Sequence, residues 1–208
     1  MDIYEFLYKV FDFYNRELFR GELPYVVITL EEREGIRGYF SPSRFKDKRE
    51  KLVGNLCINP KFFVSGNEGR VFSTIVHEMC HLYMKKNGED VVKGYHSKAW
   101  SSLMESIGLL PTSNGKEDGK KTGFSMTHLI INGGLFEKKT KELVEKEGMK
   151  FTLFSSELKK GEEENVGEKS LPGRRVRYSC DCSSFWGRKG MNVHCNECNK
   201  DFRGEKKL

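Results

Sequence analysis

Apolar side chains recur at helical spacing at the start of the chain and then give way to short β-branched runs. Residues 2–19 predict a helix, and Asp2 is available as its N-cap. Gly21 and Pro24 end that helix, because neither residue suits a helix interior. The β-branched and aromatic runs that follow predict strands over residues 25–30, 38–41 and 52–58.

Two further helices are expected in the next part of the chain. Residues 69–87 carry apolar side chains on more than one face, which predicts a buried helix. Gly88 can end this helix. Residues 97–108 predict another helix. Its expected inward-facing side chains are Ala99, Trp100, Leu103, Met104 and Ile107.

The composition changes after residue 112, where a polar, glycine-containing stretch begins. A strand is expected around residues 127–131 and a helix around 137–147. Residues 159–169 are charged and predict a solvated spacer. We therefore expect an α+β chain in three parts: residues 1–112, the connecting region 113–175, and a small cysteine module at 176–208.

The composition narrows the possible partners and cellular location of the protein but does not identify its function. Charged residues make up 32% of the chain, and the formal net charge of +6 is compatible with a polyanionic partner. No stretch approaches the roughly 18 consecutive apolar residues of a membrane span, and the N-terminus lacks a signal-peptide core. We therefore expect an intracellular monomer with no membrane partner, either cytoplasmic or nucleoid-associated in a bacterium, or nuclear in a eukaryote.

The sequence His77-Glu78-Met79-Cys80-His81 has the H-E-x-x-H pattern of zinc-dependent hydrolases. Two imidazoles four residues apart lie on one face of a helix and can reach one Zn²⁺. Glu78 can then act as a general base on a water molecule. The alternative is a surface helix with two incidental histidines. The apolar residues directly before the motif argue against it, because buried imidazoles need a partner.

A catalytic zinc site needs a third protein ligand and one open position. We favour His96, because the loop after His81 is long enough to return a side chain to the helix. The competing candidates are Glu89, Asp90 and Glu105. His128 is expected to be an ordinary surface or cap histidine. Tyr95 is one conceivable oxyanion donor, and the strand over 52–58 is the expected partner of an extended substrate.

Two close cysteine pairs predict a second, structural zinc site. Its expected ligands are Cys180, Cys182, Cys195 and Cys198, whereas His194 is expected not to bind. Residues 170–208 contain nine Lys or Arg against four Asp or Glu, and aromatic residues lie among them. This combination suits phosphates and unstacked bases. The candidate nucleic-acid contacts are Arg174, Arg175, Arg177, Trp186, Arg188, Lys189 and Arg203.

The motif and its surroundings resemble the SprT-like metalloprotease family, which includes proteases that act on DNA–protein crosslinks. The resemblance rests on His77-Glu78-Met79-Cys80-His81, on Gly94-Tyr95-His96-Ser97-Lys98-Ala99-Trp100, and on Gly38-Tyr39-Phe40-Ser41 upstream. It covers residues 1–112 and resumes at the cysteine module. It implies a zincin-like domain with a C-terminal zinc ribbon, zinc ligands at His77, His81 and His96, and a general base at Glu78.

The function expected from these features is zinc-dependent endopeptidase activity on DNA-bound or DNA-crosslinked proteins. Single-stranded or damaged DNA is the expected nucleic-acid partner, and the expected metal content is one catalytic and one structural zinc ion. Two alternatives stay open. One is a non-proteolytic, DNA-binding or transcription-associated zinc protein, and the other is a narrow peptidase with no DNA role.

Overall fold

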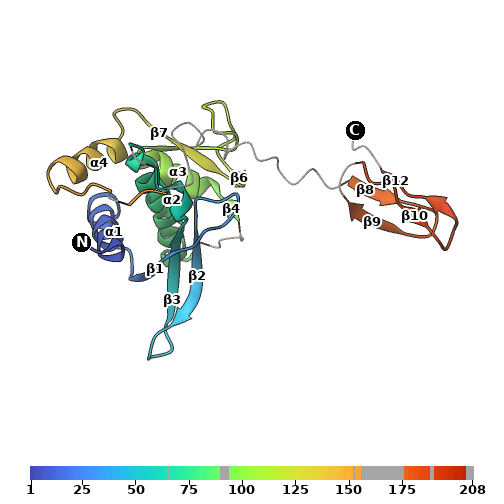
Figure 1. Cartoon of the computed structure of the whole chain (residues 1–208), viewed down its shortest axis with the longest axis horizontal. Helices are drawn as coiled ribbons and strands as arrows, with labels where there is room; N and C mark the ends of the chain where they lie inside the picture. Colours follow the sequence, from blue (N-terminus) through green and yellow to red (C-terminus); the bar gives the residue numbers. More distant parts are fainter. Residues whose placement is uncertain (65, 90–93, 152, 156–175, 188–189, 205–208) are drawn as a thin grey trace. The chain divides into compact units, whose positions relative to one another are not determined.

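The structure is a computed structural model, which describes residues 1–64, 66–89, 94–151, 153–155, 176–187 and 190–204. The chain divides into two compact units, Met1–Gly167 and Glu168–Leu208 (Figure 1). The first unit mixes helices with a small sheet, and the second contains short strands. The chain is therefore an α+β protein, as the pattern of apolar residues predicts.

The helices of the first unit agree with the sequence pattern to within two residues at each end. They are α1 (Ile3–Phe19), α2 (Glu68–Lys86), α3 (Lys98–Ser106) and α4 (Leu135–Glu145), with a 3-10 helix η1 (Pro60–Phe62). Asp2 caps α1 by accepting a hydrogen bond from the Tyr4 N–H, and Ser97 caps α3 in the same way from the Trp100 N–H. The expected inward face of α3 is correct except at Ala99, which is exposed.

The described residues of the first unit form one three-stranded sheet and two strand pairs. The strands are β1 (Val26–Leu30), β2 (Gly38–Lys46), β3 (Leu52–Ile58), β4 (Tyr95–His96), β5 (Leu109–Thr112), β6 (Gly123–Phe124) and β7 (Thr127–Ile130). The sheet has the order β1-β3-β2, with β3 parallel to β1 and antiparallel to β2. Helix α2 contacts β2 and β3 as well as α1, α3 and α4.

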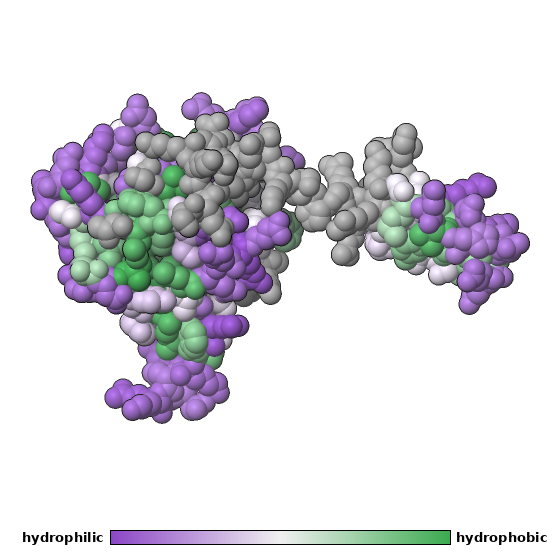
Figure 2. All heavy atoms as spheres, in the orientation of Figure 1, coloured by the Kyte–Doolittle hydropathy of each residue, from purple (hydrophilic) through white to green (hydrophobic). Residues whose placement is uncertain are grey.

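The position of β3 corrects one prediction from the sequence. The strand over 52–58 was expected to present a free edge to a substrate, but β3 is the central strand and pairs on both sides. The free edge beside α2 belongs to β2. Strand β2 also contains Pro42 and a register shift between Ser41 and Phe45, features that occur in edge strands. The charged turn between β2 and β3 is hydrophilic (Figure 2).

The first compact unit also extends beyond the expected boundary at residue 112. Strand β7 pairs with β5 over four residues, and α4 contacts α1 and α2. Phe136 of α4 stacks on Tyr14 of α1, and the hydroxyl groups of Tyr14 and Thr140 are 2.8 Å apart. Phe151 adds an edge-on contact with Phe63. The region after residue 112 therefore completes the hydrophobic core.

The second unit is held by short antiparallel strands. They are β8 (Val176–Ser179), β9 (Ser184–Gly187), β10 (His194–Cys195), β11 (Lys200–Asp201) and β12 (Arg203–Gly204). One sheet has the order β12-β8-β9, and β10 pairs with β11. Tyr178 stacks on Phe185, and Phe185 meets Phe202 edge-on. These three rings form its small apolar centre.

No helix among the residues that the structure describes is long and apolar enough to cross a membrane.

Gly108 is a position where the fold requires glycine. Its φ is +92°, and a Cβ there would lie 2.8 Å from the Leu135 backbone nitrogen. Gly88 has a φ of +76° but nothing within 4 Å of the same position. We expect Gly88→Ala to lower the free energy of unfolding by about 1 kcal/mol, and Gly108→Ala by about 3 kcal/mol, because the second change adds a clash. Urea unfolding of both variants measures the difference. Equal losses in the free energy of unfolding would show that the start of α4 can move to make room for the Cβ.

Candidate active site and metal centres

Helix α2 carries the H-E-x-x-H motif within the core of the first unit. The side chains of His77 and Glu78 are only 8% and 5% exposed, and apolar residues surround the motif. Because His77 and His81 are one helical turn apart, they project from the same face, with ring centroids 5.2 Å apart. The same periodicity that buries α2 therefore places two imidazoles side by side in a dry environment.

His96 completes a group of three imidazoles. It lies on β4, and its ring centroid is 4.8 Å from that of His81 and 5.4 Å from that of His77. One ring nitrogen from each histidine lies within 4.8 Å of the others. The Nδ1–H of His96 donates to the Gly123 carbonyl oxygen at 3.1 Å, because a carbonyl can only accept. The Nε2 lone pair of His96 is therefore left for a metal ion.

Two of the alternative third ligands, Glu89 and Glu105, do not join this group. Glu105 lies on α3 and forms an ion pair with Lys121. Glu89 is exposed, and Asp90 lies outside the described residues. Among the residues that the structure describes, the histidine group that can hold a metal ion contains His77, His81 and His96 alone.

Trp100 packs against all three imidazoles from the first turns of α3. Its ring stacks on His81 at 5.2 Å with an interplanar angle of 17°, and meets His77 and His96 edge-on. The side chain is 1% exposed, and its Nε1–H has no hydrogen-bond partner among the described residues. Trp100 therefore orders the imidazoles, and its unpaired N–H leaves one donor for a bound molecule.

Burial keeps the three imidazoles in the form that binds metal. It lowers the pKa of His77 well below its usual value, with smaller contributions from His128, His81 and His96. It also lowers the pKa of His81 to about 3, with a contribution from His96, and lowers the pKa of His96. Neutral imidazoles offer lone pairs rather than repelling a cation. This donor set fits Zn²⁺, which favours histidine nitrogen.

The buried side chain of Glu78 contacts the edge strand β2 of the sheet. The backbone N–H of Phe40 on β2 donates a hydrogen bond to its carboxylate. Burial raises the pKa of Glu78 to about 8, and this hydrogen bond opposes the rise only in part. A divalent cation beside the carboxylate would favour its ionised form. The motif glutamate is thus held between α2 and the free edge of β2.

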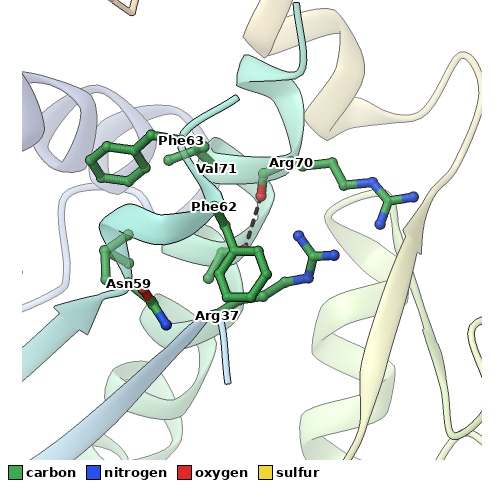
Figure 3. Close-up of a pocket in the computed structure, with 8 residues that line it drawn as sticks. Arg37, Asn59, Phe62, Phe63, Arg70 and Val71 are labelled. Atoms are coloured by element: carbon green, nitrogen blue, oxygen red, sulfur yellow. Dashed lines mark hydrogen bonds between the residues drawn. The ribbon is translucent and has the colours of Figure 1, made fainter. Parts of the chain in front are cut away.

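His128 is a site residue that the sequence interpretation missed. It was expected at the surface or at a cap, but its Nδ1 lies 3.1 Å from the Nδ1 of His77. Burial lowers the pKa of His128 to about 3, and the nearby guanidinium groups of Arg37 and Arg70 lower it further. Figure 3 shows these two arginines at a small pocket between η1 and α2, where Arg37 lies 4.7 Å from the Phe62 ring. The only sequence signal was a histidine on a predicted strand.

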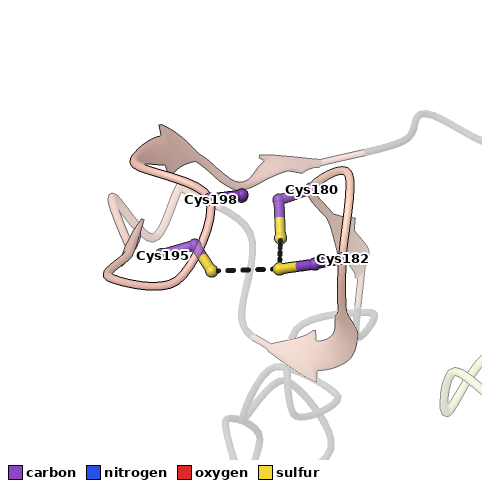
Figure 4. A group of neighbouring side chains, drawn as sticks. All are labelled: Cys180, Cys182, Cys195 and Cys198. Carbon is purple, nitrogen blue, oxygen red and sulfur yellow. Dashed lines mark hydrogen bonds between the residues drawn. The ribbon is translucent and has the colours of Figure 1, made fainter.

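The cysteine group lies in the second unit. Cys182 Sγ is 3.6 Å from Cys180 Sγ and 3.4 Å from Cys195 Sγ, and Cys198 completes the group within 4.8 Å (Figure 4). A disulfide would require about 2.05 Å, whereas four thiolates around one zinc ion lie about 3.8 Å apart. The four cysteines are free of disulfides. This geometry fits a Cys₄ metal site.

Backbone donors favour the thiolate form of one member of this group, Cys195. Hydrogen bonds from the Cys198 N–H, from Cys182 and from the Glu197 N–H lower the pKa of Cys195 to about 6. A lower pKa favours the thiolate, the form that binds zinc. His194 is turned away, with its Nδ1 2.8 Å from an Asp201 carboxylate oxygen and its Nε2 3.1 Å from Asn199. The structure therefore keeps His194 outside the group, as expected.

Three of the seven candidate nucleic-acid contacts lie within the described residues. Arg177 on β8 faces Trp186 on β9 as its cross-strand partner, and Arg203 on β12 faces Ser179. Cross-strand partners and alternate residues share one face of a sheet, so all three side chains lie on the same face. Trp186 is in a strand rather than at the expected loop tip, and it is 60% exposed. The remaining four, Arg174, Arg175, Arg188 and Lys189, lie outside the described residues.

The fold and the site define an α+β protein in which the described residues contain two groups of side chains that can each hold a metal ion. A model of the SprT-like family matches residues 7–120, which is more than half of the chain. The chain therefore belongs to the SprT-like family, which is generally metalloprotease-like. No curated protein and no solved structure matches the chain significantly.

Proposed function

We propose that this chain is a zinc-dependent endopeptidase with a zincin-like catalytic domain, and that a zinc ribbon brings it to DNA. The observation that carries the enzymatic part is the position of Glu78. It is buried, directly follows His77 on α2, and accepts a hydrogen bond from Phe40 on the edge strand β2. A purely structural metal site has no use for a buried carboxylate that does not bind the metal.

The residues of the site have separate roles in this proposal. His77, His81 and His96 hold Zn²⁺, which supplies a Lewis acid that lowers the pKa of water and polarises a carbonyl group. Glu78 accepts a proton from the attacking water and returns it to the nitrogen of the departing amine. Trp100 packs against the histidines and excludes bulk water from them. The reaction is a balanced hydrolysis, because each cleaved peptide bond consumes one water molecule and yields one carboxyl group and one amine.

Strand β2 is the proposed docking edge for the substrate. Phe40 pairs with Leu56 of β3, and its N–H is directed to Glu78 on the other side. An extended peptide that adds to this edge would run beside the base, with its carbonyl groups near the histidines. Main-chain hydrogen bonds make such recognition largely independent of side chains. This supports an endopeptidase of broad sequence tolerance.

The ribbon supplies the proposed contact with nucleic acid. Arg177 lies on the central strand of its sheet, and Arg203 and Trp186 lie on the two flanking strands, all on one face. Guanidinium groups suit phosphates, and an exposed indole can stack on an unpaired base. The apolar centre formed by Tyr178, Phe185 and Phe202 does not include Trp186. This arrangement favours single-stranded DNA over a role for the indole in folding.

Removal of the exposed indole tests this interface. We expect Trp186→Ala in the full chain to weaken binding of single-stranded DNA about tenfold, because stacking contributes about 1–3 kcal/mol per base. The zinc content is expected to stay the same. Tyr25→Ala is the matched control, because Tyr25 is 68% exposed but lies in the first unit. Fluorescence anisotropy at several salt concentrations measures both variants, and an unchanged affinity for Trp186→Ala would refute the stacking role.

A further inference from the structure

His128 makes a specific contact with one of the proposed metal ligands. It lies on β7, where pairing with Pro111 of β5 fixes its backbone position. Its Nδ1 is 3.1 Å from the Nδ1 of His77, and the two ring centroids are 5.2 Å apart. A separation of 3.1 Å is a hydrogen-bond distance, so one nitrogen donates and the other accepts. The buried imidazole of His77 and the half-buried imidazole of His128 are therefore joined by one hydrogen bond.

The nitrogen that His128 contacts is not the one that the metal needs. An imidazole has two ring nitrogens, and a contact at Nδ1 leaves Nε2 of His77 for coordination. His96 follows the same pattern, since its Nδ1 is held by the Gly123 carbonyl. His128 itself is not part of the group whose ring nitrogens lie within 4.8 Å of one another. A role for His128 as a fourth ligand is therefore disfavoured by the geometry.

We propose that His128 is a positioning residue: its Nδ1 accepts the Nδ1–H of His77 and so fixes the tautomer in which Nε2 of His77 binds the metal. This inference rests on the proposed metal site. A neutral imidazole has one acceptor nitrogen. At 3.1 Å from His77 Nδ1, the Nδ1 of His128 is placed to be that acceptor. Outer-shell acceptors of this kind fix the ring orientation of a ligand and increase its basicity. Strand β7 thereby contributes to metal binding without touching the metal.

Two substitutions separate this role from simple packing. His128→Leu removes the acceptor and keeps a side chain of similar size, whereas His128→Asn places an amide oxygen close to the position of Nδ1. We expect His128→Leu to weaken zinc binding at the histidine site by about 10- to 100-fold, and His128→Asn to stay within about threefold of the unchanged chain. Competition with a chromophoric chelator measures these affinities in the full-length protein. A His96→Ala chain is the reference for zinc bound at the cysteine site, because it lacks one of the three histidine ligands.

Nitrogen NMR of the zinc-loaded, unchanged chain gives a readout that needs no variant. We expect His77 to be protonated at Nδ1 and coordinated through Nε2. Any of three results would overturn the proposal. They are protonation of His77 at Nε2, a zinc affinity of His128→Leu equal to that of the unchanged chain, and a zinc affinity of His128→Asn as weak as that of His128→Leu. If the unchanged chain binds zinc only at the cysteines, the proposed function fails as well. If it binds two zinc ions and His128→Leu also binds both with full affinity, only the role of His128 fails.

Discussion

Replacement of Glu78 by glutamine is expected to lower the rate of protein cleavage by about 10³-fold or more while zinc stays bound. The amide has nearly the same shape as the carboxylate but cannot accept a proton, so the loss corresponds to the contribution of a general base. The three histidines are untouched, and the Phe40 N–H can still donate to the amide oxygen. The variant therefore separates proton transfer from metal binding.

The measurement follows cleavage of a DNA-binding protein by the full-length chain, with and without single-stranded DNA. Zinc content is determined on the same samples. Glu105→Gln is the matched control, because Glu105 lies on α3 in an ion pair with Lys121 and outside the histidine group. It is expected to keep full activity. Undiminished cleavage by Glu78→Gln would remove the proposed role of Glu78, and absence of cleavage by the unchanged chain under every DNA condition would favour the non-proteolytic alternative.

Loss of one ribbon cysteine is expected to unfold the second unit and reduce the zinc content from two ions to one per chain. Among the residues of the unit that the structure describes, the apolar centre contains three aromatic rings, which is too little to fold a module of this size. Structural zinc contributes about 10–16 kcal/mol in comparable small domains. We therefore expect Cys182→Ser to abolish the structure of the unit and its affinity for DNA.

The readouts for this variant are zinc stoichiometry, the fluorescence of Trp186 and susceptibility to limited proteolysis. Cys57→Ala is the matched control, because Cys57 is a buried cysteine of the first unit and belongs to neither metal group. It is expected to retain two zinc ions. A Cys182→Ser chain that keeps two zinc ions, or that resists proteolysis after residue 175, would contradict a structural Cys₄ site.

The sequence pattern predicts local features of this chain well. The positions of α1, α2, α3 and α4 follow to within two residues from apolar periodicity, helped by the caps at Asp2 and Ser97, and these are short-range properties. The spacing of the motif histidines likewise follows from helix geometry alone. The length of the loop after His81 favoured His96 without excluding Glu89, Asp90 or Glu105, and the resemblance to the SprT-like family then implied His96 as the third ligand.

Features that depend on contacts between distant residues were not predictable in the same way. Nothing in the composition of residues 52–58 says that this strand is central, because pairing order depends on which other strands fold against it. His128 is 51 residues from His77 along the chain, and only the pairing of β5 with β7 brings them together. The boundary at residue 112 was placed by a change in composition, although the core continues into α4.

One short stretch of chain holds two of the three proposed ligands by their outer nitrogens. Gly123 contacts His96 and His128 contacts His77, and both follow the polar loop that begins after β5. A single backbone cut in that loop would leave the motif helix intact but would free this stretch to move. Zinc retention is therefore expected to be more sensitive to damage at residues 113–122 than folding is, so a nicked chain would be inactivated before it is unfolded.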